Sequence, residues 1–258
     1  MTRHLRRAVD TAFSVLVLSM LASCGGGKTS PTVSPPTLLP AVTASPAATP
    51  APPSTVDILS AASARLAATA TVRFSLHIDG VTYIDDAKTI QLLEARGGLV
   101  RPDKVSTDFK IKVLGGVNVS MKLIIVAKNH WSTDLVTGKW GIAPTEFGYN
   151  PSILFDNQGG IGPVLQRVTD PVPLEGGTIR GRSTVHVRGN VEEAAIAPLT
   201  SNTMRGSPVT VDLWIDPLTN DLLRARLTEP ANTEGRQPAV WTLDLADQGS
   251  DLKIDPPI

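Results

Sequence analysis

A strict alternation of apolar and polar side chains constrains the fold of this chain more than any other feature of its sequence. The clearest stretch is KVSTDFKIKV, residues 104–113. Val105, Thr107, Phe109, Ile111 and Val113 alternate there with charged or hydroxyl-bearing residues. Because successive side chains of a β-strand point to opposite faces, this pattern predicts a strand with one buried face and one face in water.

Six further stretches show the same two-residue period, so we expect nine or ten strands in an antiparallel sheet. Gly115-Gly116 follows residues 104–113 and predicts a two-residue hairpin turn into the next stretch. The six are VRFSLHI (72–78), VNVSMKLIIVA (117–127), TIRGRSTVHVRG (178–189), VTVDLWID (209–216), LLRARLTE (222–229) and AVWTLDLAD (239–247). The residues expected on the apolar side are Val117, Val119, Met121, Leu123 and Ile125 in 117–127, Ile179, Val185 and Val187 in 178–189, and Val209, Val211, Leu213 and Ile215 in 209–216.

Three segments carry helical or covering patterns instead. VDILSAASARLAATA (56–70) has an apolar stripe with helical spacing and a cap at Ser54 or Thr55. NVEEAAIAPL has a capping residue at Asn190 followed three positions later by Glu193, which predicts a short helix. NPSILFDNQGGIGPVLQRV (150–168) is an apolar interruption between the two groups of strands.

These elements predict an α+β fold, a strongly curved antiparallel half-barrel sheet with helices covering its concave face. A sheet this wide must curl, and its apolar side must be covered. Aromatic residues make up only 4% of the chain, so the filling is mostly aliphatic. Three short helices leave room for an apolar cavity and an apolar ligand. The alternative is an ordinarily packed α+β core.

The N-terminus resembles a bacterial lipoprotein signal. Arg3, Arg6 and Arg7 precede a roughly eleven-residue apolar run, which is too short to cross a bilayer as a helix. LASC then resembles a lipobox ending at Cys24, the one cysteine of the chain. We expect Cys24 to carry diacylglyceryl and palmitate-type acyl groups that anchor the protein to a membrane, since several chains anchor where one does not. The alternative is a buried core cysteine.

Three regions follow: a signal peptide at 1–23, a lipidated cysteine and linker at 24–55, and a folded domain at 56–258. Residues 25–55 hold eight prolines and one charged residue, Lys28. This composition predicts an extended spacer reaching on the order of 90 Å, or a glycosylated stalk with the same role. We expect an exported protein, lipid-anchored to the cell membrane and facing the periplasm or the cell exterior.

Charge and motifs argue against several function classes. The formal net charge is zero at pH 7, which gives no field for nucleic acid. His77, His130 and His186 show no metal-ligand spacing, and His77 and His186 are expected to be solvated on polar strand faces. No serine-hydrolase elbow, phosphate-binding loop or dinucleotide-binding turn is present. We therefore expect neither an enzyme nor a cofactor or metal.

Residues 105–257 resemble the LppX/LprG family of lipoproteins, known from the envelopes of mycobacteria and their relatives. The likeness rests on the order of KIKVLGGVNVSMKLIIVAKNHWSTDLVTGKW, YNPSILFDNQGGIGPVL, GGTIRGRSTVHVRGNV, VDLWIDPLTNDLLRARL and LKIDPP. Together with the lipobox and the first helix, it covers the whole mature domain.

The resemblance implies a half-open sheet enclosing a hydrophobic cavity, and a role in binding lipids or glycolipids and carrying them in the cell envelope. Its expected partners are a lipid or glycolipid ligand, the membrane through the lipidated cysteine, and a membrane transporter. A surface adhesin or protein-binding lipoprotein is the alternative. Ordinary core packing is an equal interpretation of each expected acyl-chain contact: Val119, Met121, Leu123, Ile125, Ile153, Leu154, Phe155, Val185, Val187, Val211, Leu213 and Ile215.

Overall fold

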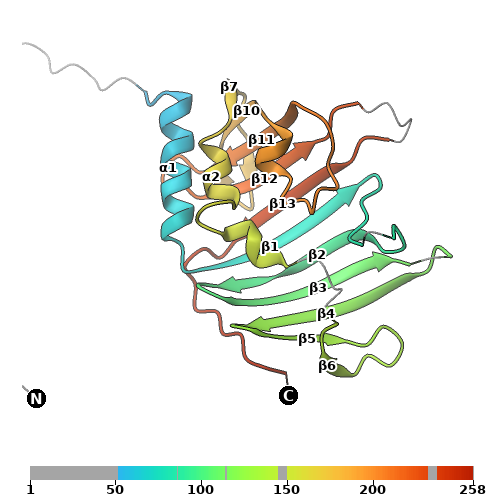
Figure 1. Ribbon diagram of the computed structural model, residues 1–258. Helices are drawn as coiled ribbons and strands as arrows, with labels where there is room; N and C mark the ends of the chain where they lie inside the picture. The colour runs from blue at the N-terminus through green and yellow to red at the C-terminus, as the bar shows by residue number, and fades with distance from the viewer. Residues whose placement is uncertain (1–51, 86, 114, 145–149, 232–236, 258) are drawn as a thin grey trace, which may run out of the picture. The chain divides into compact units, whose positions relative to one another are not determined.

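An eleven-stranded antiparallel sheet dominates the computed structural model, which describes residues 52–85, 87–113, 115–144, 150–231 and 237–257 (Figure 1). The first half of the chain supplies β1 (Thr71–Asp79), β2 (Gln91–Val100), β3 (Lys104–Lys112), β4 (Asn118–Val126), β5 (Asn129–Thr133) and β6 (Trp140–Ile142). The second half supplies β7 (Thr169–Leu174), β10 (Val185–Val191), β11 (Val209–Ile215), β12 (Leu222–Thr228) and β13 (Val240–Ala246). Apart from residues 178–183, the alternating stretches of the sequence therefore lie in one antiparallel sheet.

The two halves meet at the centre of the sheet. The strand order is β6-β5-β4-β3-β2-β1-β13-β12-β11-β10-β7, and β1 pairs with β13 with Leu76 opposite Leu243. The short strands β6 and β7 are the two edges, so the sheet does not close into a barrel. Glycine is required at Gly97 in β2, because a Cβ there would lie 1.9 Å from the carbonyl oxygen of Ser106 in β3.

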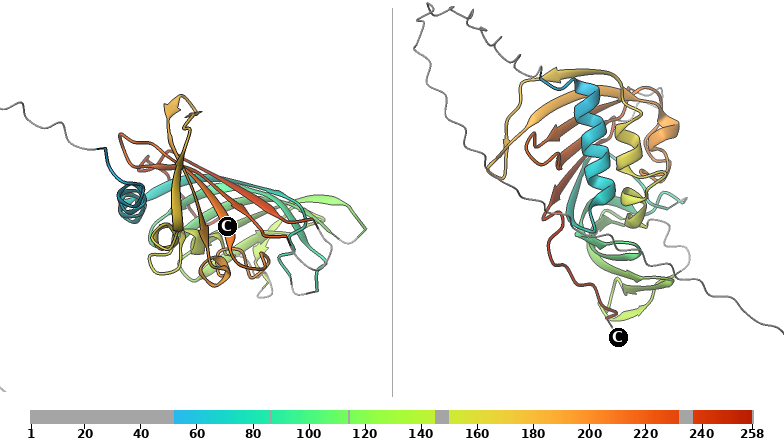
Figure 2. Two further views of the ribbon diagram at one scale, coloured as in Figure 1. Left: turned by 90° about the horizontal axis from the view of Figure 1, so that it is seen from above. Right: turned by 90° about the vertical axis from the view of Figure 1, so that its left-hand side faces the viewer.

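The connection from β6 to β7 must travel from one edge of the sheet to the other. It contains the 3₁₀ helix η1 (Pro151–Phe155) and the helix α2 (Ile161–Leu165), and both lie on one side of the sheet (Figures 1 and 2). Both helices pack on the apolar face of the sheet. We call residues 150–165, which contain them, the crossing segment. A further helix, α3 (Glu193–Ile196), lies between β10 and β11.

The first helix, α1 (Thr55–Ala68), begins where the sequence predicts. Ser54 is its N-cap: the hydroxyl oxygen of Ser54 accepts from the backbone N–H of Asp57, and the Asp57 carboxylate accepts from the N–H of Ser54. This reciprocal arrangement satisfies two backbone donors that a helix start leaves free. α1 packs against α2 and β7.

Five details of the sequence interpretation are wrong. The Gly115-Gly116 turn closes on a Val113–Val117 hydrogen-bonded pair, so the connection spans three residues rather than two. Val117, which was expected on the apolar side of its strand, is 57% exposed. Residues 178–183 form a separate hairpin of β8 (Thr178–Ile179) and β9 (Arg182–Ser183), so Ile179 lies outside the large sheet. Asn190 belongs to β10, and α3 begins at Glu193. The described residues contain thirteen strands, more than the nine or ten expected.

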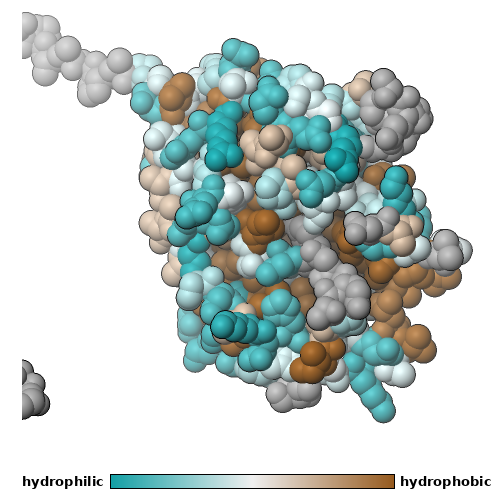
Figure 3. Space-filling view, in the orientation of Figure 1, coloured by the Kyte–Doolittle hydropathy of each residue, from teal (hydrophilic) through white to brown (hydrophobic). Residues whose placement is uncertain are grey.

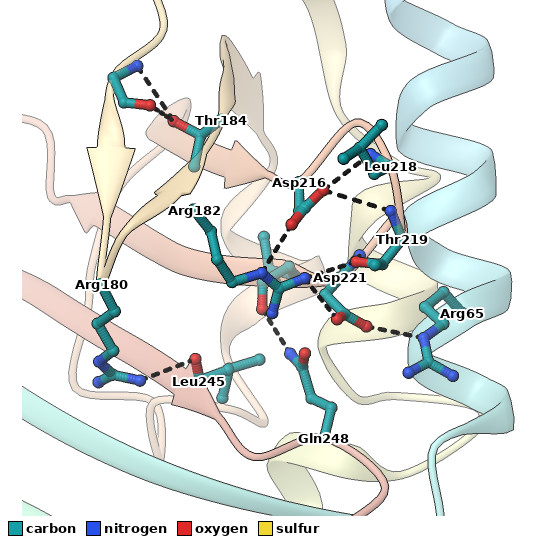
Figure 4. Close-up of polar contacts among 12 residues, drawn as sticks. Arg65, Arg180, Arg182, Thr184, Asp216, Leu218, Thr219, Asp221, Leu245 and Gln248 are labelled. Carbon is teal, nitrogen blue, oxygen red and sulfur yellow. Dashed lines mark hydrogen bonds and ion pairs between the residues drawn. The ribbon is translucent and has the colours of Figure 1, made fainter.

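A cluster of charged side chains ties α1 to the hairpin β8–β9 and to the turn between β11 and β12 (Figure 4). Arg182 donates to Asp216 and to Asp221 at 2.7 Å each, and Arg65 of α1 donates to the other oxygen of Asp221 at 2.7 Å. Burial raises the pKa of Asp221, but the hydrogen bonds from Arg182 and Arg65 outweigh it and hold that pKa below its usual value. This cluster fixes α1 relative to the second half of the sheet.

We expect Arg182→Ala to lower the free energy of unfolding by about 2–3 kcal/mol, because it removes a partner from two nearly buried carboxylates. Urea unfolding at pH 7 measures the change. Carboxylates with a lowered pKa contribute stability above about pH 4 and lose it as the pH falls through their folded-state pKa, so the difference should shrink in acid.

Arg73→Ala is the matched control, because Arg73 and its partner Asp247 are both more than half exposed. Its expected cost is below about 1 kcal/mol. Equal effects of the two substitutions would contradict the role given to Arg182.

Candidate functional site

The apolar inner face of the sheet and the crossing segment form one continuous hydrophobic cluster. All twelve residues expected to contact acyl chains belong to it or pack against it. Nine are buried, namely Met121, Leu123, Ile125, Leu154, Phe155, Val187, Val211, Leu213 and Ile215, whereas Val119, Ile153 and Val185 are partly buried. The structure therefore brings these residues together, and their contact with a ligand stays a prediction.

The crossing segment is shaped by local polar contacts and held down by apolar ones. Asn150 caps η1 by accepting from the N–H of Ser152 at 3.0 Å. The ring of Phe155 lies 6.3 Å from that of Phe74 on β1, measured between centroids. After η1, the Asp156 carboxylate accepts from the N–H groups of Gly159 and Gln158, which lower its pKa. The turn presents Phe155 inward and polar groups outward.

A small apolar pocket lies inside this cluster, under the crossing segment. Its volume is about 30 Å³, and no polar surface lines it. Of the twelve predicted contact residues, Leu154 lines it. The other lining residues are Leu76, Ile161, Leu199, Thr200, Ala225, Leu227, Trp241 and Leu243.

The residues of this pocket were not predicted as a site, although the sequence carries a signal for them. Leu76, Ala225, Leu227, Trp241 and Leu243 alternate in stretches that were correctly interpreted as strands. They were not selected because the sequence does not show that β1, β12 and β13 lie at the centre of the sheet.

The pocket has roughly the volume of one water molecule, which is far too small for an acyl chain. The predicted apolar cavity is therefore not confirmed among the described residues. Side chains of the crossing segment, including the fully buried Leu165, belong to the same hydrophobic cluster as the inner face of the sheet.

One hydroxyl is out of place on the apolar face. Thr107 on β3 is 1% exposed, and its Oγ1 has no hydrogen-bond partner among the described residues. Its neighbours along the same strand face, Val105 and Phe109, are buried apolar residues. A buried hydroxyl without a partner lowers stability, unless something else bonds to it.

The outer face of the sheet is charged, as the alternation predicts, but His186 is not solvated there. Its Nε2 lies 2.8 Å from Oδ1 of Asp212, which also accepts from Arg188, and its ring stacks on Trp214 at 4.3 Å. The guanidinium of Arg224 lies over the ring of Trp214. His186 is a structural residue of a packed outer cluster.

The described residues hold neither a metal site nor a membrane-spanning helix. They contain no group of three histidine, cysteine or acidic side chains placed to hold a metal ion. Among the same residues, no helix combines the length and the apolar character needed to span a bilayer. Cys24 and the predicted signal sequence lie outside the described residues.

The fold and this face define a class: an open antiparallel sheet whose apolar side is covered by a short crossing segment. The family model of the LppX_LprAFG lipoproteins matches residues 54–254 of the sequence, so the chain belongs to that family. The resemblance stated from the sequence is confirmed.

Two solved structures share the fold. The chain superimposes on LprF from Mycobacterium bovis with a TM-score of 0.63 and 19% identity, over 79% of this chain and 96% of that one. LppX from Mycobacterium tuberculosis gives 0.55 and 13%, over 78% and 98%.

Sequence similarity to curated proteins is confined to a shorter stretch. LprF of M. bovis and of M. tuberculosis, whose name gives diacylated glycolipid transport as its proposed role, is 34% identical over 77 residues. That stretch is 29% of this chain and 29% of each relative.

We expect Thr107→Val to raise the free energy of unfolding by about 1 kcal/mol, because it replaces an unpaired buried hydroxyl with a methyl group of similar shape. Chemical denaturation of the two proteins measures the change. Thr200→Val is the matched control: Thr200 is fully buried, and its hydroxyl donates to the carbonyl of Ile196, so its loss should destabilise by a similar amount. Destabilisation by Thr107→Val would show that this hydroxyl has a partner.

Proposed function

We propose that this chain is a lipoprotein that binds the acyl chains of a lipid or glycolipid between the inner face of its sheet and the crossing segment, and carries or presents that lipid in the cell envelope. The observation that supports this most is the cover itself. Five-residue helices, η1 and α2, close an apolar face that extends from β4 to β10. Short helices gain little stability of their own, so their packing is their main support.

In this proposal the acyl chains replace side chains of the crossing segment. The segment moves away from β1 and β3, and the methylene groups take over the contacts that Leu154 and Phe155 now make. Each buried methylene contributes about 0.8 kcal/mol, so a long chain offsets the loss of these contacts. The small pocket beside Leu154 and Ala225 is the point from which such an opening would widen.

The unpaired hydroxyl of Thr107 supports the same site. An acyl ester has a carbonyl oxygen, and a lipid bound along β3 would bring it into an otherwise apolar face. That oxygen would satisfy the Thr107 hydroxyl, which otherwise costs free energy in the empty protein.

The N-terminal region would determine where the protein works. Residues 1–23 would act as the export signal, Cys24 as the acylated anchor, and the residues between Cys24 and the start of α1 as the spacer to the folded domain. The protein would then stand on the outer side of the cell membrane and exchange its lipid with a membrane transporter. Membership of a lipoprotein family and the proposed role of LprF support this arrangement.

A substitution inside the pocket tests the lipid site. Ala225→Phe adds a ring where the acyl chains are proposed to enter, so it should reduce the amount of bound diacyl lipid by about tenfold or more. Native mass spectrometry of the protein after incubation with lipid vesicles measures the bound fraction. Ala68→Phe, on the exposed last residue of α1, adds the same ring outside the site.

Circular dichroism and thermal unfolding of each variant separate a filled site from a damaged fold. If Ala225→Phe folds and binds as much lipid as the parent, the acyl chains lie elsewhere. A parent protein that carries no lipid from cells and takes none from vesicles would contradict the proposed function altogether.

The anchor is tested separately. Cys24→Ala removes the thiol that would be acylated, so the protein should leave the membrane fraction or accumulate with its signal uncleaved. Cell fractionation with immunoblotting detects either result. A processed Cys24→Ala protein that stays with the membrane would show that another feature anchors it.

A further inference from the structure

One end of the sheet carries most of the large apolar side chains that lie in water. The described residues include nine such exposed side chains. Four of them lie in three turns at the same end of the sheet, and a fifth lies on β6, the strand that follows the last of these turns. We call these five residues the apolar end: Val81 between β1 and β2, Val117 between β3 and β4, Leu135 and Val136 between β5 and β6, and Ile142 on β6.

The pairing of the strands brings the three turns to one end. Gln91 at the start of β2 pairs with Lys112 at the end of β3, and Lys112 pairs in turn with Asn118 at the start of β4. β5 runs antiparallel to β4, so its last residue, Thr133, points toward the same end. The turns lie on the right-hand side of Figure 1, away from α1. In Figure 3, hydrophobic residues gather on that side.

The turn from β5 to β6 is held in shape by Asp134. Its Oδ1 accepts from the N–H groups of Val136 and Thr137 at 3.1 and 2.7 Å, and its own N–H donates to the carbonyl of Lys139. Asp85 accepts hydrogen bonds in the same way within the turn from β1 to β2. Val136 is therefore 92% exposed on an ordered turn, which loses little conformational freedom when it binds something.

Lysines flank the apolar residues. Lys88 lies in the turn from β1 to β2, Lys112 at the start of the turn from β3 to β4, and Lys139 in the turn from β5 to β6. Lys88 and Lys139 are exposed, and Trp140, which follows Lys139, is half-buried. Aliphatic tips beside lysine and tryptophan are typical of segments that lie at a membrane interface, where ammonium groups meet lipid phosphates.

This arrangement fits a bilayer better than a folded partner. A stable protein interface is a continuous, closely packed patch of about 800 Å² on each partner. The apolar end presents instead one or two side chains on each of three turns. Fluid headgroups fill the spaces between such turns, and each side chain can enter the interface separately.

The proposed anchor leaves the apolar end free to reach the membrane. The cap of α1 is Ser54, so about thirty residues separate the folded domain from Cys24. Extended, they would span on the order of 90 Å. The longest strand of the sheet has ten residues and a length of about 33 Å. A domain on such a tether can turn its far end to the membrane, and the tether raises the effective concentration of that end at the surface.

We propose that the apolar end docks on a lipid bilayer, with Val136 and its neighbours in the interface between headgroups and acyl chains and the three lysines against lipid phosphates. This inference goes beyond the proposed function, because it concerns the outside of the domain and not the lipid held within it. The docking gives the folded domain a second contact with the membrane besides the proposed acylated cysteine.

A fluorescent label tests which end meets the bilayer. The full chain with Cys24→Ala has no cysteine left, so an introduced cysteine takes an environment-sensitive fluorophore at one position. With vesicles of equal parts phosphatidylcholine and phosphatidylglycerol, the label in Val136→Cys should shift its emission to shorter wavelength. Lipids brominated in their acyl chains should quench it.

Leu218→Cys is the matched control. Leu218 is 90% exposed, and it lies in the turn from β11 to β12 at the opposite end of the sheet. Its label should show neither the shift nor the quenching. The N-terminal region is the same in both proteins, so vesicle binding through that region cannot produce a difference between the two labels.

A second comparison removes the neighbours of the labelled residue. Leu135→Ser with Ile142→Ser in the Val136→Cys chain should lower the ratio of docked to free label about tenfold, because two apolar side chains no longer leave water. Val56→Ser with Val172→Ser removes two exposed valines elsewhere and should leave the ratio unchanged. All four positions are exposed, and circular dichroism checks that each variant folds.

The outcomes that overturn the docking are separate from those that concern cargo. A label at position 136 that stays in water, equal responses at positions 136 and 218, or an unchanged response after the Leu135→Ser and Ile142→Ser substitutions would each overturn it. A label that stays in water would leave this end of the sheet to a protein partner. Whether the protein retains a lipid is measured independently by native mass spectrometry.

Discussion

The passage of the chain from one edge of the sheet to the other is the constraint on which the rest of the structure depends. β6 and β7 lie at opposite edges, so the residues between them must cross a face of the sheet. The outer face carries charged side chains, whereas the inner face is apolar. The apolar side chains of the crossing segment can therefore be buried only against the inner face. The connection thereby becomes the cover of the core, and its own helices, η1 and α2, are five residues long.

The two ends of this cover are attached differently. α2 is joined to α1 by buried polar contacts, since Ser63 donates to the carbonyl of Gly162 and accepts from Gln166. α1 is fixed in turn to the second half of the sheet through Arg65 and Asp221. η1, by contrast, meets β1 and β3 through side chains such as Phe155 and Phe74. Apolar contacts lack direction and are easily replaced by other apolar groups, so under the proposed function acyl chains would enter at the η1 end.

The sequence predicted what depends on local order and missed what depends on distant pairing. Alternation in residues 104–113 was enough to predict β3, and Ser54 with Asp57 was enough to predict the start of α1. Strand β7 was not predicted, because Pro171 and Pro173 are unfavourable inside a sheet. β7 is an edge strand, however, and an edge strand tolerates proline. His186 was predicted to be solvated because its partner, Asp212, lies on another strand. No residue count shows whether the space under the sheet is open or packed, so the sequence could not decide between the predicted cavity and an ordinarily packed core.

The close packing of the apolar cluster has a physical consequence for the proposed acyl site. An empty acyl site that stayed open would expose its apolar lining to water, so a carrier gains from closing it with its own side chains. Under the proposed function, the pocket of about 30 Å³ would be the place where the closed cluster begins to open. The acyl chains would displace η1 as they enter, so admission of the lipid and opening of the cover would be coupled through the five residues of η1.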